Sequence, residues 1–175
     1  MAPAIRPAAP SDAAAIQAIY AHHVLHGTAT FEEVPPDQPE IARRQAEIAG
    51  RGLPYLVAEE GRRVLGFAYA GPYRARSAYR FTLEDSIYLA PDAAGRGLGR
   101  RLLERLIAGC TAVGARQLVA VIGDSGNAAS IALHERLGFA HAGTLRSVGF
   151  KFGRWLDTVQ MQLPLGPGDG TLPEG

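Results

Sequence analysis

The chain has 175 residues, 47% of them hydrophobic, which is enough to bury one sizeable core, and this length favours a single domain over two. Its 18 basic and 17 acidic residues leave a formal net charge of +1, with no long run of one sign. A nucleic acid is therefore not an expected partner, because no broad basic face is indicated that would hold its backbone. The single cysteine, Cys110, excludes an intrachain disulfide and a thiolate zinc site, and it fits a reducing compartment.

The N-terminal ten residues include alanines and prolines but no charged start followed by a long apolar stretch. We therefore expect neither a signal peptide nor a membrane anchor. No apolar run approaches the roughly 20 residues that a membrane-spanning helix needs. The expected location is the cytoplasm, without a membrane partner.

Strands and helices are predicted in mixed order along the chain, which indicates an α/β fold. Apolar periodicity predicts helices over 13–24, from 38 or 39 to 50, over 98–113 and over 128–137, the first capped by Ser11 with Asp12. Short apolar or β-branched runs predict strands over 5–7, 55–59, 64–70, 84–89, 117–122 and 159–163. The proline-rich, acidic stretch 28–39 is predicted as a loop beside a cleft. One domain is expected over 1–165, followed by a disordered tail over 166–175.

A glycine-rich turn joins the predicted strand 84–89 to the next helix. Gly95, Gly97 and Gly99 allow positive φ and close backbone approach, so amide N–H groups at the helix start can converge on a pyrophosphate. The turn lacks the Gly-Lys-Ser/Thr ending of a P-loop, and no acidic residue follows about 20 positions later, as a Rossmann turn requires. A plain glycine-capped turn is the remaining alternative. The cofactor-binding residues predicted here are Gly95, Arg96, Gly97, Leu98, Gly99 and Arg100.

Residues 94–99 resemble the R/Q-x-x-G-x-G/A signature of the GCN5-related N-acetyltransferase (GNAT) superfamily, with Ala94 in place of the usual Arg or Gln. Further along, the chain resembles the superfamily's N-x-x-A/S-x-x-L-Y/H-x-x-x-G-F helix at Asn127, Ser130, Leu133, His134, Gly138 and Phe139. The resemblance implies acetyl-coenzyme A as co-substrate, with Asn127 and Ser130 among the residues that bind it. It also implies a mixed, mostly antiparallel central sheet with two splayed parallel strands and flanking helices.

In such enzymes the pantetheine arm lies between the splayed strands, bonded like an added strand. The resemblance therefore implies that Ile87, Tyr88 and Leu89 offer backbone groups to the cofactor. The backbone N–H of Tyr88 or Leu89 would polarise the carbonyl oxygen of the acetyl group.

Four segments, 71–79, 84–88, 119–123 and 149–157, are similar to the phosphinothricin N-acetyltransferase subfamily, and the likeness runs from Ile5 to Leu165. The resemblance implies acetylation of the α-amine of phosphinothricin, methionine sulfoximine or methionine sulfone. It also implies a homodimer.

Acetyl transfer needs a neutral amine, so a base or a water molecule must accept a proton from the α-ammonium group. Glu84 matches the subfamily's proposed general base by resemblance, and an ordinary strand-end carboxylate is the alternative. Asp85 should point to the opposite face of the strand. His134 stands where many members have a tyrosine. Its imidazole either protonates the leaving thiolate or only hydrogen-bonds the cofactor or a neighbour.

Arg74, Arg76 and Tyr79 lie between a predicted strand and Glu84, where they can border the acceptor cleft. Arginine suits carboxylate, phosphinate and sulfone oxygens because it binds them in a bidentate manner, whereas a solvated surface pair is the plain alternative. Phe31, in the early loop, would cover the cleft. No metal site is predicted, because the histidines of the first helix have no carboxylate or cysteine clustered with them.

Two other functions stay open at the level of the sequence. A non-catalytic acetyl-coenzyme A sensor would keep the fold, but Glu84 and His134 weigh against it. A protein- or peptide-directed acetyltransferase would use the same chemistry, but Arg74 and Arg76 favour a small anionic acceptor.

Overall fold

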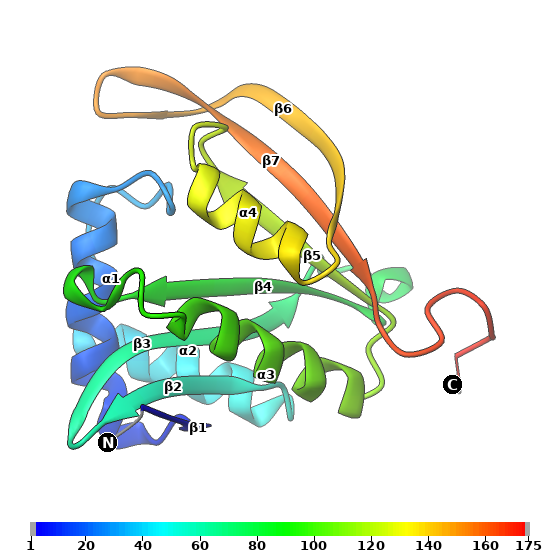
Figure 1. Ribbon diagram of the computed structural model, residues 1–175, viewed down its shortest axis with the longest axis horizontal. Helices are drawn as coiled ribbons and strands as arrows, with labels where there is room; N and C mark the ends of the chain where they lie inside the picture. The colour runs from blue at the N-terminus through cyan, green and yellow to red at the C-terminus, as the bar shows by residue number, and fades with distance from the viewer. Residues whose placement is uncertain (1–2, 174–175) are drawn as a thin grey trace.

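Residues 3–173 are described by the computed structural model, in which seven strands form one sheet in the order β1-β2-β3-β4-β5-β7-β6 (Figure 1). Only β4 and β5 pair in parallel among these residues, and the other neighbouring strands are antiparallel. The predicted mixed and mostly antiparallel sheet is thereby confirmed. The strands are β1 (Ala4–Pro7), β2 (Tyr55–Glu60), β3 (Arg63–Pro72), β4 (Thr82–Leu89), β5 (Gln117–Gly123), β6 (Ala140–Lys151) and β7 (Arg154–Pro164).

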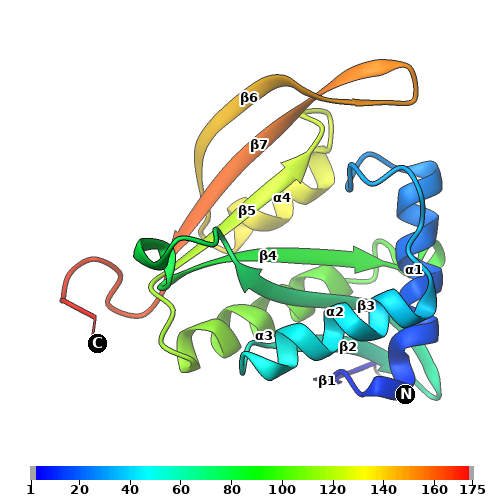
Figure 2. The same cartoon turned by 180° about the vertical axis from the view of Figure 1, so that it is seen from behind.

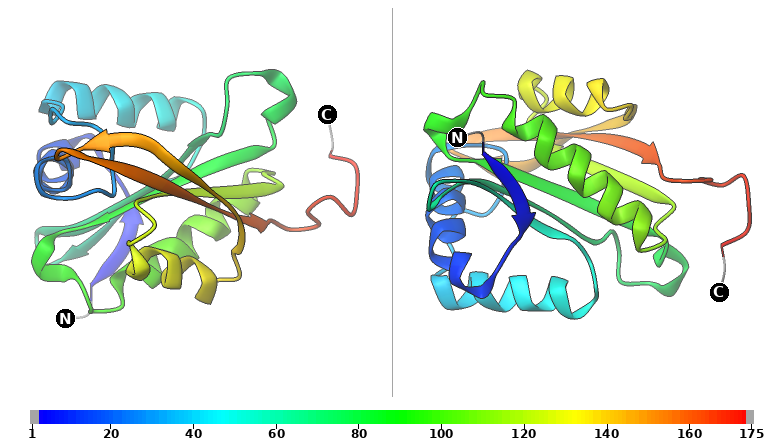
Figure 3. Two further views of the ribbon diagram at one scale, coloured as in Figure 1. Left: turned by 90° about the horizontal axis from the view of Figure 1, so that it is seen from above. Right: turned by 60° about the horizontal axis from the view of Figure 1, so that its bottom comes forward.

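Helices cover both faces of the sheet (Figures 2 and 3). On one face lie α1 (Ala13–His26) and α2 (Gln38–Gly50), which contact each other, and on the other lie α3 (Leu98–Ala112) and α4 (Ala128–Arg136). Asp37 caps α2, because its side chain accepts a hydrogen bond from the backbone N–H of Glu40 at 2.9 Å. Within residues 3–173, no helix has both the length and the apolar stretch needed to cross a membrane.

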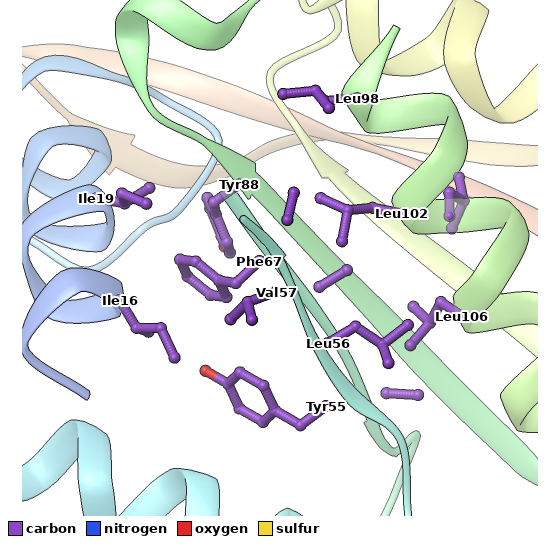
Figure 4. Close-up of a cluster of buried hydrophobic side chains, with 14 of the residues drawn as sticks. Ile16, Ile19, Tyr55, Leu56, Val57, Phe67, Tyr88, Leu98, Leu102 and Leu106 are labelled. Carbon is purple, nitrogen blue, oxygen red and sulfur yellow. The ribbon is translucent and has the colours of Figure 1, made fainter. Parts of the chain in front are cut away.

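The core fills both sides of the central strands (Figure 4). Ile16 of α1 packs on one side, and Leu102 and Leu106 of α3 pack on the other, all of them fully buried. Their spacing of four residues places the α3 leucines on one stripe of the helix. Burial of each such side chain stabilises the fold by about 1.5–3 kcal/mol. Strand β4 therefore lies between α1 and α3, which both contact it.

Two local predictions were wrong. Neither Ser11 nor Asp12 caps α1 with its side chain; the Asp12 carboxylate instead pairs with Arg6 at 2.8 Å and accepts from the N–H of Ala9 at 2.7 Å. Strand β6 was not predicted at all. Most of its side chains are exposed and its pairing with β7 is interrupted twice, so it lacks the apolar alternation that marks a strand.

The segment after β7 turns back against the body of the protein. The Arg116 guanidinium donates hydrogen bonds to the carbonyl oxygens of Gly168 at 3.1 Å and Leu172 at 3.2 Å. These contacts weigh against a disordered tail. The division into a domain over 1–165 and a disordered tail over 166–175 stays a prediction, and residues 174 and 175 lie outside the described part.

Candidate active site

The parallel strands β4 and β5 separate half-way along. Their pairing ends at the rung that joins Asp85 to Ala120, although β4 continues to Leu89 and β5 to Gly123. Figure 1 shows the two strands starting together and ending apart. We call the gap between residues 86–89 and 121–123 the fork, and the rung at Asp85 its apex. Along the fork, the edge of β4 that faces β5 offers backbone groups to a ligand, because β3 pairs with the opposite edge. The carbonyl oxygen of Leu89 already accepts a hydrogen bond from Nε2 of His23 at 2.8 Å.

A cavity of about 270 Å³ occupies the fork. Its walls come from both strands, from the loop after α1 and from α4. Several predicted site residues meet there, although their positions in the sequence are far apart. The cavity is lined by Phe31, Glu84, Ile87, Tyr88, Asn127, Ser130 and His134, together with Ala29, Thr30, Asp85, Ser86, Ala120, Val121, Ile122, Gly123 and Thr158.

The predicted glycine-rich turn lies between β4 and α3. Gly95 and Gly97 have φ of 74° and 73°, in the left-handed region, and Gly97 is the N-cap of α3. The first N–H groups of a helix have no partner within it, so the start of α3 is a site for an anion. Gly99 makes a close approach possible as well, because a Cβ there would lie 3.3 Å from the Leu133 side chain. Leu98 is buried and anchors the turn.

Arg96 of the turn and Arg100 of the first turn of α3 both pair with carboxylates on the surface. Arg96 pairs with Glu60 at 2.8 Å, and Arg100 pairs with Glu104 at 2.7 Å. Such exposed pairs are weak in water, so a phosphate group is able to replace the carboxylate. On α4, Asn127 is the N-cap, and its Oδ1 accepts from the N–H of Ser130 at 3.3 Å.

Glu84 is half-buried at the wall of the fork cavity. Burial raises the pKa of its carboxyl group, the negative charge of Asp85 raises it further, and the positive charge of Arg74 lowers it. A carboxylate with a raised pKa is a stronger base than one free in water. The position and the environment of Glu84 therefore suit proton removal.

His134 and Asp85 form a buried pair at the apex of the fork. Nε2 of His134 lies 3.0 Å from Oδ2 of Asp85, and its Nδ1 lies 2.8 Å from the carbonyl oxygen of Ser130. Both side chains are 2% exposed. Asp85 thus points toward α4, as strand alternation predicts. Because both ring nitrogens of His134 already have partners, this geometry favours the hydrogen-bonding alternative over the thiolate-protonating acid, and the acid role stays a prediction.

The model of the Acetyltransferase (GNAT) family matches residues 17–139. The chain belongs to the GNAT acetyltransferase family. A phosphinothricin N-acetyltransferase from Alcaligenes faecalis is 64% identical to it over 163 residues, which cover 93% of this chain and 83% of that protein. An L-methionine sulfoximine/L-methionine sulfone acetyltransferase from Pseudomonas aeruginosa is 46% identical over 171 residues, covering 95% and 97%.

A solved structure extends the likeness to three dimensions. A GNAT superfamily phosphinothricin acetyltransferase from Sinorhizobium meliloti, crystallised with acetyl-coenzyme A, superposes with a TM-score of 0.96 at 50% identity. The match covers 99% of this chain and 94% of that one. The resemblance inferred from the glycine turn and the α4 motif is thereby confirmed.

In this GNAT protein the predicted acceptor-binding residues are divided. Phe31 lines the fork cavity, whereas Arg74, Arg76 and Tyr79 are exposed and line a separate groove. The Arg74 guanidinium lies over the Tyr79 ring, 5.8 Å from its centroid. Of the two arginines, Arg74 affects the fork cavity electrostatically, because its positive charge lowers the pKa of Glu84.

Sequence reasoning missed the residues that hold the Phe31 loop in place. The buried Lys151 of β6 donates hydrogen bonds from Nζ to the carbonyl oxygens of Gly27 at 2.9 Å and Thr30 at 2.8 Å. Gly149, two residues earlier on the same strand, lies so close to Phe31 that a Cβ there would overlap the ring. The signal in the sequence was a lysine and a glycine at alternate positions of an otherwise aromatic segment.

Proposed function

We propose that this GNAT protein transfers the acetyl group of acetyl-coenzyme A to the α-amine of a small amino-acid-like acceptor of the phosphinothricin, methionine sulfone or methionine sulfoximine type. The observation that carries the proposal is the fork cavity, where backbone groups on the edge of β4 that faces β5 lie beside a half-buried carboxylate, Glu84. The names of the relatives from Alcaligenes faecalis and Pseudomonas aeruginosa support the acceptor class.

The residues present fit the co-substrate. The positive φ of Gly95 and Gly97 and the free N–H groups at the start of α3 suit a pyrophosphate, and the fork suits an extended arm. Acetyl-coenzyme A supplies a thioester whose acyl carbon an amine can attack. Among the protein's own groups, Glu84 accepts the proton of the acceptor ammonium, directly or through one water. Of the two predicted N–H donors, that of Leu89 is proposed to polarise the acyl oxygen, because Tyr88 lies opposite Phe67 at a rung whose backbone groups face β3.

A thiol-release screen tests the reaction and the acceptor class together. We expect acetyl-coenzyme A to be consumed with phosphinothricin, methionine sulfone or methionine sulfoximine, and an unsubstituted amino acid such as alanine to react more slowly. The product mass should show the gain of one acetyl group, and its fragmentation should place that group on the α-nitrogen. Faster turnover of peptides would favour the protein-directed alternative. Binding of acetyl-coenzyme A without thiol release from any acceptor would favour a sensor.

Although Arg76 lines a groove separate from the fork cavity, we propose that it recognises the acceptor's anionic groups, and Arg76→Ala tests this. We expect the acceptor KM to rise about 10- to 100-fold, because a hydrogen bond to a charged group is lost, while the KM for acetyl-coenzyme A stays nearly constant. Steady-state kinetics with methionine sulfone measures both constants. The control is Arg62→Ala, an exposed arginine in the turn between β2 and β3. An unchanged acceptor KM with weaker co-substrate binding would assign Arg76 to the co-substrate instead.

The proposal includes a homodimer, and the β6–β7 hairpin supports it. Phe150 and Trp155 pack edge to face with ring centroids 5.2 Å apart, yet they are 56% and 65% exposed. Further apolar side chains on this hairpin are exposed as well: Leu145, Val148 and Phe152. Several exposed apolar side chains on one hairpin are typical of an interface, and a second copy of the chain would cover them.

Trp155→Glu should therefore convert the protein from dimer to monomer, because a charge would be buried without a partner at the interface. Light scattering after size-exclusion chromatography measures the mass. Val113→Glu, at an exposed apolar position just after α3, is the control that should remain dimeric. A Trp155→Glu variant that keeps the wild-type dimer mass would place the interface elsewhere.

Location in the cytoplasm is also part of the proposal, supported by a lone cysteine, Cys110, that is buried.

A further inference from the structure

The buried pair of Asp85 and His134 lies at the apex of the fork, where β4 and β5 begin to separate. Asp85 is the last residue of β4 that pairs with β5, and the next residues form the wall of the fork. His134 belongs to α4, the helix that follows β5 in the chain. The 3.0 Å contact between them therefore joins the two sides of the fork at its apex.

Hydrogen-bond partners define the protonation of the pair. The Ser130 carbonyl oxygen can only accept, so Nδ1 of His134 carries a hydrogen. Nε2 lies 3.0 Å from Oδ2 of Asp85, so one hydrogen lies between these two atoms, and we infer that Nε2 carries it because the pKa of His134 is raised. The ring is then an imidazolium, and the pair has no net charge. Burial lowers the pKa of His134, but the hydrogen bond and the charge of Asp85, together with the hydrogen bond to Ser130, raise it by more, so the pKa is raised overall.

The surroundings leave Asp85 dependent on this partner. The thiol of Cys110, on α3, is neutral, since burial and the charge of Asp85 raise its pKa to about 12. Glu84, the neighbour on β4, carries the same charge as Asp85, and β5 has no ionisable side chain. Within the described residues, Oδ1 of Asp85 is buried and has no hydrogen-bond partner. His134 is thus the group that balances the carboxylate.

We propose that Asp85 is a positioning residue, whose ion pair with His134 holds β4 to α4 at the apex and so sets the width of the fork for the co-substrate. This inference rests on the proposed function, because it assigns the fork to acetyl-coenzyme A. It gives His134 a different task from protonation of the thiolate. A buried pair of this kind is costly to break, because the remaining charge is left without a partner.

Two variants of Asp85 separate geometry from charge. Asp85→Ala removes the link, so we expect the dissociation constant for acetyl-coenzyme A, measured by calorimetry, to rise about 10- to 100-fold through a displaced fork wall. Asp85→Asn keeps the shape, and its amide can donate to a neutral His134 ring, so its loss should be several-fold smaller. The exposed Asp169→Asn serves as control. Equal affinity in Asp85→Ala and wild type overturns the proposal.

Nitrogen NMR of ¹⁵N-histidine-labelled protein gives a readout that needs neither co-substrate nor acceptor. His134→Gln assigns the signal among the five histidines. We expect the wild-type ring to stay protonated on both nitrogens above pH 6.5, and the ring in Asp85→Asn to be neutral there with its hydrogen on Nδ1. A neutral His134 in wild type at pH 6.5 overturns the ion pair. If the wild-type protein shows the imidazolium but does not bind acetyl-coenzyme A, the ion pair is confirmed and the proposed function is wrong. The proposal that the pair positions the co-substrate is then wrong as well.

Discussion

Glu84→Gln should lower kcat by about 10²–10⁴-fold and leave the affinity for acetyl-coenzyme A near that of the wild type. The amide has almost the same shape as the carboxylate but cannot accept the proton of the acceptor ammonium. The rate of thiol release at saturating substrate concentrations gives kcat, and calorimetry gives the affinity for acetyl-coenzyme A. The matched control is Glu135→Gln, an exposed position on α4.

The pH dependence of the same variant makes the test sharper. In wild type, kcat/KM should fall as the pH falls through the pKa of Glu84, because the protonated carboxyl group is not a base. Burial and Asp85 raise that pKa, so this acid limb should lie above the pH at which an ordinary glutamate titrates. The Gln variant should lack this limb. It should recover in part at high pH, where solution supplies the free amine.

Full kcat in Glu84→Gln at neutral pH would make Glu84 a structural carboxylate. Circular dichroism is needed beside the kinetics, since a variant that loses its fold would also lose activity. The half-buried position and the raised pKa indicate that replacement of the carboxylate by a neutral amide relieves an unfavourable charge. We therefore expect Glu84→Gln to be at least as stable as wild type at neutral pH.

Local patterns were enough to predict the elements that position the site. The alternation of glycines at Gly95, Gly97 and Gly99 predicted the turn before α3, and two of these glycines adopt the left-handed conformation that the pattern allows. The apolar stripe of α3 and the hairpin of β2 and β3 were predictable for the same reason. Periodicity reports on neighbours within one element, and these features depend on little else.

Contacts between distant segments were not predictable from such patterns. Asp85 and His134 are 49 residues apart, and Lys151 reaches the loop that ends α1 across 124 residues. Both contacts depend on the register of the strands and on helix packing, which are properties of the folded structure and cannot be read from local sequence patterns. Closeness in the sequence was equally unreliable as a guide to closeness in space: Arg74 and Arg76 lie near Glu84 in the sequence, but they line a separate groove.

These long-range contacts connect the sites of the molecule. Lys151 and Gly149 of β6 hold the Phe31 loop from the inner face of the hairpin, whereas Phe150 and Phe152 between and beside them are exposed. Alternation along the strand thus gives the hairpin two faces. One supports the wall of the fork cavity, and the other is the proposed dimer surface.

Gly97→Val should weaken the binding of acetyl-coenzyme A by at least about 100-fold, which corresponds to the loss of two hydrogen bonds to a charged group. Gly97 has φ of 73° and is the N-cap of α3, so a β-branched residue there is strained and moves the helix start from the pyrophosphate site.

Gly114→Val is the matched control. Gly114 also has positive φ, 83°, but it follows the other end of α3, and a Cβ at either glycine meets no atom within 4 Å. Both variants should therefore lose similar thermal stability through backbone strain, because strain at positive φ does not depend on the ligand. Only Gly97→Val should lose affinity in calorimetry. Equal affinities in the two variants would show that the turn is a plain glycine-capped one and that the pyrophosphate binds elsewhere.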